Sequence, residues 1–362
     1  MESVAMNPSF WSGKRVLITG HSGFKGGWLS LWLQMMNAKV IGYSLPAPTS
    51  PSLFDVARVE EKIDSIIGDI RDFDHLRRVI KTHQPEIVFH LAAQAIVRLS
   101  YEDPLNTFDS NIMGTVKLLE AIRSVDCVRA VVIITSDKCY ENREWCWGYR
   151  EIDPMGGFDP YSSSKGCAEL ITSAYRRSFF NRQFNDSITE TLIATARAGN
   201  VIGGGDWGTD RLVPDIMKSF MAEKPVIIRH PQAIRPWQYV LEPLRGYLML
   251  VEKLWSEGHR YADAWNFGPD DSSSRSVQWI VDCLVTAWGD SAAWQLDMAI
   301  NPHEAHYLKL DCSKARLEMG WKPLLSLSQS LNLVVQWYRA FYEKHDMYEE
   351  TCRQIENYQH LI

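Results

Sequence analysis

The chain has 362 residues, of which 46% are hydrophobic and 23% charged, so it can bury a substantial core and wholesale disorder is not expected. Its net charge of -6 argues against a nucleic-acid partner, because such proteins carry a basic footprint. The apolar runs are too short to span a bilayer, and the first residues lack a signal-peptide pattern, so we expect no membrane partner. Seven cysteines without a CxxC pair predict a reduced, cytoplasmic compartment, and neither they nor the histidines show the spacing of a metal site.

Strands and helices alternate through the first half of the chain. We expect strands at residues 14–19, 39–44, 63–68, 87–91, 130–135 and 191–197. Helices are expected at 28–36, 76–82, 106–123 and 161–180. This alternation predicts an α/β fold, a Rossmann-type doubly wound parallel sheet with helices on both faces.

The second half is less regular. A loop at 203–214 leads into a helix near Pro214, and residues 226–240 are expected as strand, loop and strand. A helix at 244–255 and a strand ending in WNFGP follow. A last helix has Ser326 as its N-cap and the apolar stripe Leu327, Leu331, Val334, Tyr338 and Phe341. We expect residues 1–199, with return segments at about 236–268, to form mainly the Rossmann domain, and residues 200–362 to form mainly a smaller, interleaved substrate-binding lobe.

A glycine-rich turn separates the first expected strand from the helix that follows. Its glycines permit a tight turn and let the backbone approach a pyrophosphate at the helix N-terminus. Because the turn stands directly after the first strand, a dinucleotide site is favoured over a turn whose glycines serve only helix packing. The expected cofactor contacts in this turn are Gly20, Ser22, Gly23, Phe24, Lys25 and Gly26.

The ends of the later strands are expected to line the same crevice, where ligands of doubly wound sheets bind. The second strand ends in Tyr43–Ser44, with no acid for the ribose of NAD and no arginine for a 2′-phosphate. The absence of a phosphate clamp favours NAD without excluding NADP. Asp69 and Ile70 are expected beside the adenine, with a turn or capping role as the alternative for Asp69.

The fourth strand ends in HLAAQ, whose small residues would let the cofactor approach the backbone, with packing as an equal alternative. The cofactor contacts expected here are Leu91, Ala92, Ala93 and Gln94, together with Asn111 from the following helix.

Five residues form a candidate catalytic group. On a helix, Tyr161 and Lys165 share one face, and an ammonium there would lower the tyrosine pKa from about 10. With Ser136 they could remove the proton of a secondary alcohol while a nicotinamide takes its hydride. Asp137 and Lys138 add an acid and an amine that simple alcohol oxidation does not require, which indicates a second step. Taken alone, each motif could be a surface pair or a solvated loop.

Four residues of the second half are candidates for substrate binding: Asn200, Arg211, Arg235 and Tyr239. Arginine forks suit phosphate oxygens, so Arg235 and then Arg211 are the first candidates for a diphosphate. A surface salt bridge is an equal alternative for each arginine.

Together these motifs resemble the extended short-chain dehydrogenase/reductase family, whose members act on nucleotide sugars. The resemblance runs from KRVLITGHSGFKG to LKLDCSKA. Within the family it is strongest to 4,6-dehydratases of bacterial O-antigen synthesis, in the segments TGHSGFKGGWL, TSDKCYENREW, DPYSSSKGCAE, RAGNVIGGGDW and IRPWQYVLEPL. It implies bound NAD, CDP-glucose as substrate, and a homodimer or homotetramer built on the helices near 106–123 and 161–180.

The resemblance also implies roles for the catalytic group. Tyr161 would deprotonate the sugar 4-hydroxyl, and Asp137, protonated, would donate to the departing C6 hydroxyl. Many related dehydratases have glutamate where this chain has Lys138. As the base for the C5 proton, Lys138 needs a pKa lowered from about 10.4 by burial or by neighbouring cations. A nucleotide-sugar 4-epimerase and a non-catalytic dinucleotide sensor are the alternatives.

Overall fold

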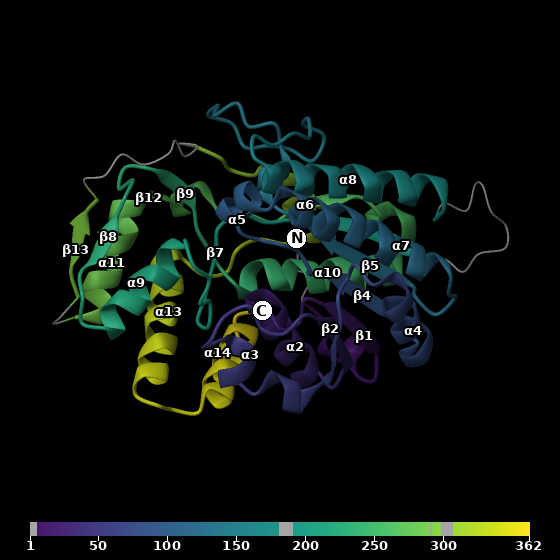
Figure 1. Cartoon of the computed structure of the whole chain (residues 1–362), viewed down its shortest axis with the longest axis horizontal. Coiled ribbons are helices and arrows are strands. Elements are labelled where there is room, and N and C mark those ends of the chain that lie inside the picture. Colours follow the sequence, from purple (N-terminus) through teal and green to yellow (C-terminus); the bar gives the residue numbers. More distant parts are fainter. Residues whose placement is uncertain (1–5, 181–190, 290–291, 298–306) are drawn as a thin grey trace.

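The computed structural model describes residues 6–180, 191–289, 292–297 and 307–362. A parallel seven-stranded sheet lies at its centre, and Figure 1 labels four of its strands, β1, β2, β4 and β5. The strand order is β11–β6–β5–β4–β1–β2–β3. Its strands are β1 (Arg15–Thr19), β2 (Lys39–Ser44), β3 (Asp64–Ile67), β4 (Ile87–His90), β5 (Ala130–Ile134), β6 (Leu192–Arg197) and β11 (Ala264–Asn266). The order reverses between β1 and β4, which is the switch point where such sheets bind ligands. The expected Rossmann-type fold is confirmed.

Two layers of helices explain why most residues of these strands are apolar. Side chains alternate along each strand, so Val16 and Ile18 enter one core and Leu17 enters the other. The first core includes α2 (Phe24–Met35) and α10 (Leu241–Glu257), and the second includes α4 (Phe73–His83), α7 (Gly114–Arg123) and α8 (Pro160–Ser178). Both layers are visible in Figure 1.

The helix expected at 106–123 is present, but its backbone differs from the prediction. It comprises α6 (Pro104–Phe108), a π-helical turn η2 (Asp109–Met113) and α7. A π turn holds one residue more than an α turn, so it shifts the face on which later side chains lie. The 3.6-residue period used for the prediction cannot reveal such a turn.

The second half folds partly back onto the sheet. Helix α10 packs on the first face, and β11 extends the sheet beside β6. Three two-stranded pairs stand apart: β7 (Val201–Ile202) with β10 (Gln238–Tyr239), β8 (Val226–Ile228) with β13 (Trp294–Leu296), and β9 (Ile234–Pro236) with β12 (Ser274–Ser276). The strand, loop and strand expected at 226–240 are thus three short strands.

Helices complete the second half. Ser326 caps α13 (Leu327–Tyr342) through a capping box with Gln329, which confirms the predicted N-cap. Helix α14 (Met347–Gln359) follows α13 and packs against α2. The remaining elements are α1 (Pro8–Trp11), α3 (Leu53–Val56), α5 (Val97–Glu102), α9 (Leu212–Met221), α11 (Val277–Trp288), α12 (Ser313–Met319) and the turns η1 (Val59–Lys62), η3 (Asp137–Cys139), η5 (Gly258–Tyr261) and η6 (Asp271–Ser273).

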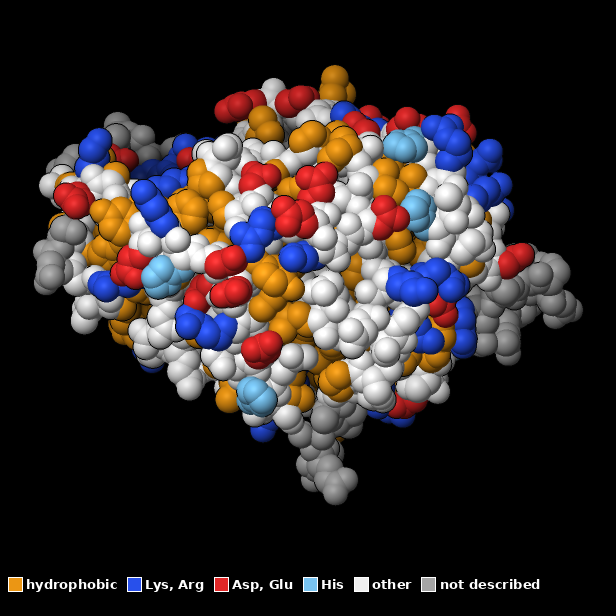
Figure 2. Space-filling view, turned by 90° about the horizontal axis from the view of Figure 1, so that it is seen from below, with side chains coloured by type: hydrophobic (Ala, Val, Ile, Leu, Met, Phe, Trp, Pro, Cys, Tyr) orange, Lys and Arg blue, Asp and Glu red, His pale blue; other side chains and the backbone are white. Residues whose placement is uncertain are grey.

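The surface carries charges of both signs. Figure 2 shows a face on which lysine and arginine side chains lie among aspartate and glutamate side chains. Within the described ranges, no helix combines the length and the apolar character needed to cross a bilayer.

Candidate active site

The glycine turn between β1 and α2 has almost no room for side chains. Gly20 has φ +80°, and a Cβ on it would lie 2.7 Å from the backbone nitrogen of Ala92. A Cβ on Gly26 would lie 2.1 Å from the Gly20 carbonyl oxygen. Gly23 is the N-cap of α2 and provides no capping side chain. Backbone N–H groups at this helix start can therefore meet a pyrophosphate, which fits the expected dinucleotide.

His21, a buried residue of this turn, packs against the neighbouring strands. The His21 ring lies against Gly42, and its two nitrogens lie 3.1 Å from the Ser44 hydroxyl and 2.8 Å from the Ser65 hydroxyl. Burial lowers the pKa of His21 to about 4, so the ring is neutral. Sequence analysis assigned no role to His21, because its partners lie on two other strands.

The residues expected near the adenine lie at the far end of the same sheet edge. The Asp69 carboxylate accepts hydrogen bonds from Arg71, which hold its pKa below the usual range. Ile70 is buried against Gly114. Asp69 thus has the local partner of a turn residue, although it remains half-buried at the crevice.

Asn111 connects three elements. Its amide nitrogen donates to the Gln94 carbonyl at 2.9 Å and to the Ser164 hydroxyl at 2.8 Å, and its oxygen accepts from the Gln94 N–H at 2.8 Å. Because Asn111 stands in the π turn, η2 holds the β4 loop against α8. These bonds show a brace between the expected cofactor loop and the catalytic helix.

The turn η3, called the catalytic turn for the candidate residues Asp137 and Lys138 that it carries, follows shortly after β5 with Ser136 as its N-cap. The Ser136 hydroxyl donates to Asp137 at 2.9 Å and accepts from the Lys138 N–H. Asp137 is buried, and its carboxylate lies where a Cβ on Gly199 would stand. Burial raises the pKa of Asp137, although the Lys138 charge and the Ser136 bond oppose it. Lys138 is exposed, so the burial expected for a base is not provided by the protein.

Tyr161 and Lys165 lie in the first two turns of α8, whose start is fixed by the Asp159 cap and Pro160. Tyr161 lies near enough to Ser136 for that hydroxyl to favour the Tyr161 phenolate. Burial nevertheless raises the pKa of Tyr161 to about 12, so the expectation that this pKa is lowered is wrong for this structure. Burial also lowers the pKa of Lys165 to about 8.

Further cations surround this group. Burial, followed by the charges of Lys165 and Arg211, lowers the pKa of Lys25 to about 7. Lys25 therefore lies near the catalytic residues as well as in the glycine turn. Arg211 is near enough for its charge to act on Tyr161, while its own guanidinium binds Asp206 at 3.0 Å.

Of the substrate candidates treated next, Arg235 and Asn200 remain candidates, whereas Tyr239 lies in the core. The charge of Arg235 acts on Asp137, and Arg235 faces Arg275 across β9 and β12, a partner that sequence analysis missed. Asn200 is half-buried and follows β6. Tyr239 is fully buried, and its hydroxyl donates to Gln354. Its assignment to the substrate site is corrected, because its polar atom is already bound inside the core.

The structure therefore brings together Lys25, Ser136, Asp137, Lys138, Tyr161, Lys165, Arg211 and Arg235 beside the switch point of the sheet. A parallel sheet with this glycine turn and this tyrosine–lysine helix defines the short-chain dehydrogenase/reductase class.

Comparisons with known proteins narrow the class. The profile of the GDP-mannose 4,6 dehydratase family matches residues 17–333. CDP-glucose 4,6-dehydratase of Salmonella typhimurium is 56% identical over 353 residues, which cover 98% of each chain. A dTDP-glucose 4,6-dehydratase of Xanthomonas campestris is 25% identical over 89% of this chain and 92% of its own. The chain belongs to the GDP-mannose 4,6 dehydratase family, an extended short-chain dehydrogenase/reductase family, as the motifs indicated.

Solved structures confirm the fold. UDP-glucose 4-epimerase of Thermotoga maritima, with UDP-glucose, superimposes with a TM-score of 0.76 at 21% identity, covering 90% of this chain and 99% of the epimerase. The dTDP-glucose 4,6-dehydratase of Bacillus anthracis, in complex with NAD, gives a TM-score of 0.73 at 21% identity, covering 93% and 100%.

Proposed function

We propose that the protein is a CDP-glucose 4,6-dehydratase that forms CDP-4-keto-6-deoxyglucose and water for deoxysugar synthesis. The observation that carries this function is the buried Asp137 beside the Tyr161 group. Burial raises the pKa of Asp137, which is the direction that a general acid requires. A 4-epimerase needs no such acid. The 56% identical relative of the same printed activity supports the choice of substrate.

The glycine turn, Gln94 and the loop held by Asn111 would bind NAD. When bound, NAD would supply the chemistry of accepting a hydride from C4 of the sugar and returning one to C6. Burial alone disfavours the Tyr161 phenolate, and a cationic nicotinamide held beside Tyr161 would favour it.

The chain's own groups would move three protons. Tyr161, beside Ser136, takes the proton of the 4-hydroxyl. Lys138 takes the C5 proton once the substrate covers its exposed side chain, and Asp137 gives its proton to the C6 hydroxyl as it leaves. Lys138 would then return its proton to C5 as the hydride reaches C6, so that the products are water and the 4-keto-6-deoxy sugar. Arg211, Arg235 and Arg275 would bind the diphosphate, because their forks match its oxygens.

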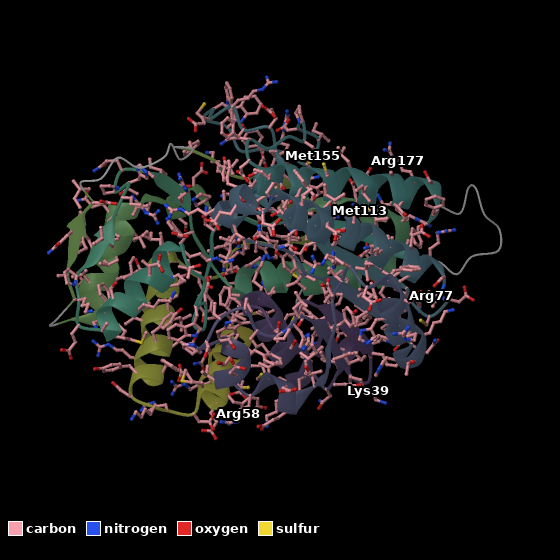
Figure 3. All side chains as sticks on the ribbon, viewed as in Figure 1. Lys39, Arg58, Arg77, Met113, Met155 and Arg177 are labelled. Carbon is pink, nitrogen blue, oxygen red and sulfur yellow. The ribbon has the colours of Figure 1, made fainter. Side chains whose placement is uncertain are left out.

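We also propose a cytoplasmic homodimer or homotetramer, with the division at residue 199 and the return segments expected from the sequence. Exposed apolar side chains on the α6–α8 layer support an interface there, namely Leu105, Met113, Leu170 and Phe179. Met113 is labelled in that layer in Figure 3. All seven cysteines are free, which supports a reducing compartment.

A substrate panel tests the function. The purified protein is incubated with CDP-, dTDP-, GDP- and UDP-glucose, and the 4-keto product is followed by its alkaline ultraviolet absorbance. We expect the CDP sugar to be preferred. Formation of a 4-epimer without a 4-keto product would establish the epimerase instead, and no turnover with bound NAD would favour the sensor.

The assignment of Lys138 is tested separately. Lys138→Ala should still reduce bound NAD on addition of CDP-glucose but should not release product. If the variant forms product at the wild-type rate, Lys138 is not the base.

A further inference from the structure

A buried carboxylate lies one helical turn beyond Lys165. Glu169 is four residues further along α8 and is almost completely buried. It accepts hydrogen bonds from the hydroxyl of Thr195 at 2.7 Å, from Thr135, and from the guanidinium of Arg197 at 2.8 Å. Burial opposes its ionisation, but Arg197 and these bonds outweigh it and hold the pKa of Glu169 below the usual range. Glu169 is thus an anion fixed beneath the catalytic group.

The network continues into the catalytic turn. Arg197 donates to the Tyr140 hydroxyl at 2.6 Å, and Tyr140, directly after η3, donates to Asn266 on β11 at 2.8 Å. Arg197 and Glu169 are each 4% exposed, so the ion pair is shielded from solvent. The chain of bonds therefore joins α8, β6, β11 and the segment that follows Asp137.

Lys165 is packed against few ionised groups. His90 on β4 and Cys139 on η3 are neutral, because burial lowers the pKa of His90 to about 3 and raises that of the Cys139 thiol. Lys25 on α2 adds repulsion, and Tyr161 on α8 is protonated in this structure. Glu169 is the largest influence that favours the ammonium of Lys165.

We propose that Glu169 is a positioning residue for the reaction: its buried carboxylate keeps Lys165 charged, and its bonds to Thr135, Thr195 and Arg197 hold α8 in register with the catalytic turn. This inference rests on the proposed function, because it concerns the lysine that assists Tyr161. Sequence analysis assigned no role to Glu169, whose partners lie on β5 and β6.

An activity-independent titration tests the charge. The protein is labelled with ¹³C at the lysine ε-carbons, and the Lys165 resonance is assigned by its loss in Lys165→Arg. We expect a midpoint near 8 in the wild type. In Glu169→Gln the midpoint should fall by about one to two pH units, the size expected for removal of a near, partly screened charge.

The matched control is Glu350→Gln, which alters another buried glutamate paired with an arginine, on α14. Its Lys165 midpoint should equal that of the wild type. Glu169→Asp keeps the charge and should restore the midpoint. A wild-type midpoint in folded Glu169→Gln overturns the proposal.

A double variant covers failure of Glu169→Gln to fold. Glu169→Leu with Arg197→Met removes both charges, a replacement that buried ion pairs often tolerate. The Lys165 midpoint must again fall, and an unchanged midpoint overturns the proposal. In active enzyme, the alkaline limb of the kcat profile should move by the same amount. A wild type inactive on every sugar nucleotide would defeat the proposed function while leaving the titration decisive.

Discussion

The proposed coenzyme end and the proposed substrate end of the site differ in what they present to a ligand, which is backbone at the first and side chains at the second. At the proposed coenzyme end the contact surface would be backbone, because Gly20 and Gly26 leave no space for a side chain. At the proposed substrate end the contact surface would consist of long side chains, with Arg211 bound to Asp206 and Arg235 facing Arg275. A backbone turn is already ordered, whereas arginine side chains lose rotamer freedom when they bind. A substitution at the first end should therefore weaken ligand binding strongly, and a substitution at the second end should weaken it in part.

The largest expected effect is at Tyr161, where the two ends meet. Tyr161→Phe should lower turnover on the order of a thousandfold, because it removes the group that takes the proton, while binding at both ends persists. Product formation, coenzyme binding and thermal unfolding measure this. Tyr247→Phe is the control, because Tyr247 is also buried and its hydroxyl makes no hydrogen bond to the part of the chain that the structure describes. Near-wild-type turnover in Tyr161→Phe would contradict the assigned role.

The second largest effect is expected from a substitution in the glycine turn, which should weaken NAD binding. Gly26→Ala places a Cβ 2.1 Å from the Gly20 oxygen, so the turn must open. We expect NAD binding, measured by calorimetry, to weaken about a hundredfold, the result of losing several backbone bonds of about 1 kcal/mol each. Gly258→Ala is the control: its φ is +74° with nothing within 4 Å, so it should cost only about 1 kcal/mol of stability. Wild-type affinity in Gly26→Ala would refute the preformed turn.

A substitution among the arginines of the proposed substrate end should weaken substrate binding only in part. Arg235→Met should raise KM for the nucleotide sugar roughly tenfold to a hundredfold, the value of one charge-assisted contact, and change kcat much less. Steady-state kinetics separates the two constants. Arg260→Met, at an exposed arginine in η5, should leave both unchanged. Equal behaviour of the two variants would remove Arg235 from the substrate site.

Acid should destabilise the folded chain through two buried histidines. Burial holds the pKa of His21 at about 4 and that of His90 at about 3, both below the unfolded value of 6.5. The unfolded chain therefore binds more protons below about pH 6.5, so this stability is complete above that pH and is lost as the pH falls. Each histidine should cost roughly 2 kcal/mol at about pH 5.

Urea unfolding at about pH 7 and about pH 5 measures this loss. His90→Asn should reduce the difference between the two pH values by about 2 kcal/mol. An unchanged difference would show that His90 is not held neutral.

Sequence patterns predicted the sheet well because each strand has a recognisable apolar pattern within its own few residues. Residues 39–44 and 87–90 are short apolar runs that must be buried on both faces, and both are strands in the structure. The π turn at 109–113 was not predicted, since the 3.6-residue helical period does not reveal an extra residue. Within this turn, Asn111 donates hydrogen bonds to Gln94 and Ser164 of other segments, which sequence spacing does not report.

The sequence could predict most residues of the candidate site, but not their burial, their pKa shifts or their hydrogen-bond partners. Ser136, Tyr161 and Lys165 follow from spacing and strand order. The raised pKa of Tyr161, the neutral His21 and the partners of Glu169 arise from burial among distant segments, which spacing does not report. Tyr239 was misplaced for the same reason, because its partner Gln354 lies on the last helix.

The central claim is that one hydrogen moves within one sugar. CDP-glucose carrying deuterium at C4 is converted by the protein in ordinary water, and the product is examined by NMR and mass spectrometry. The account predicts that the label appears at C6, in the new methyl group. Loss of the label to solvent, or its retention at C4, would contradict it.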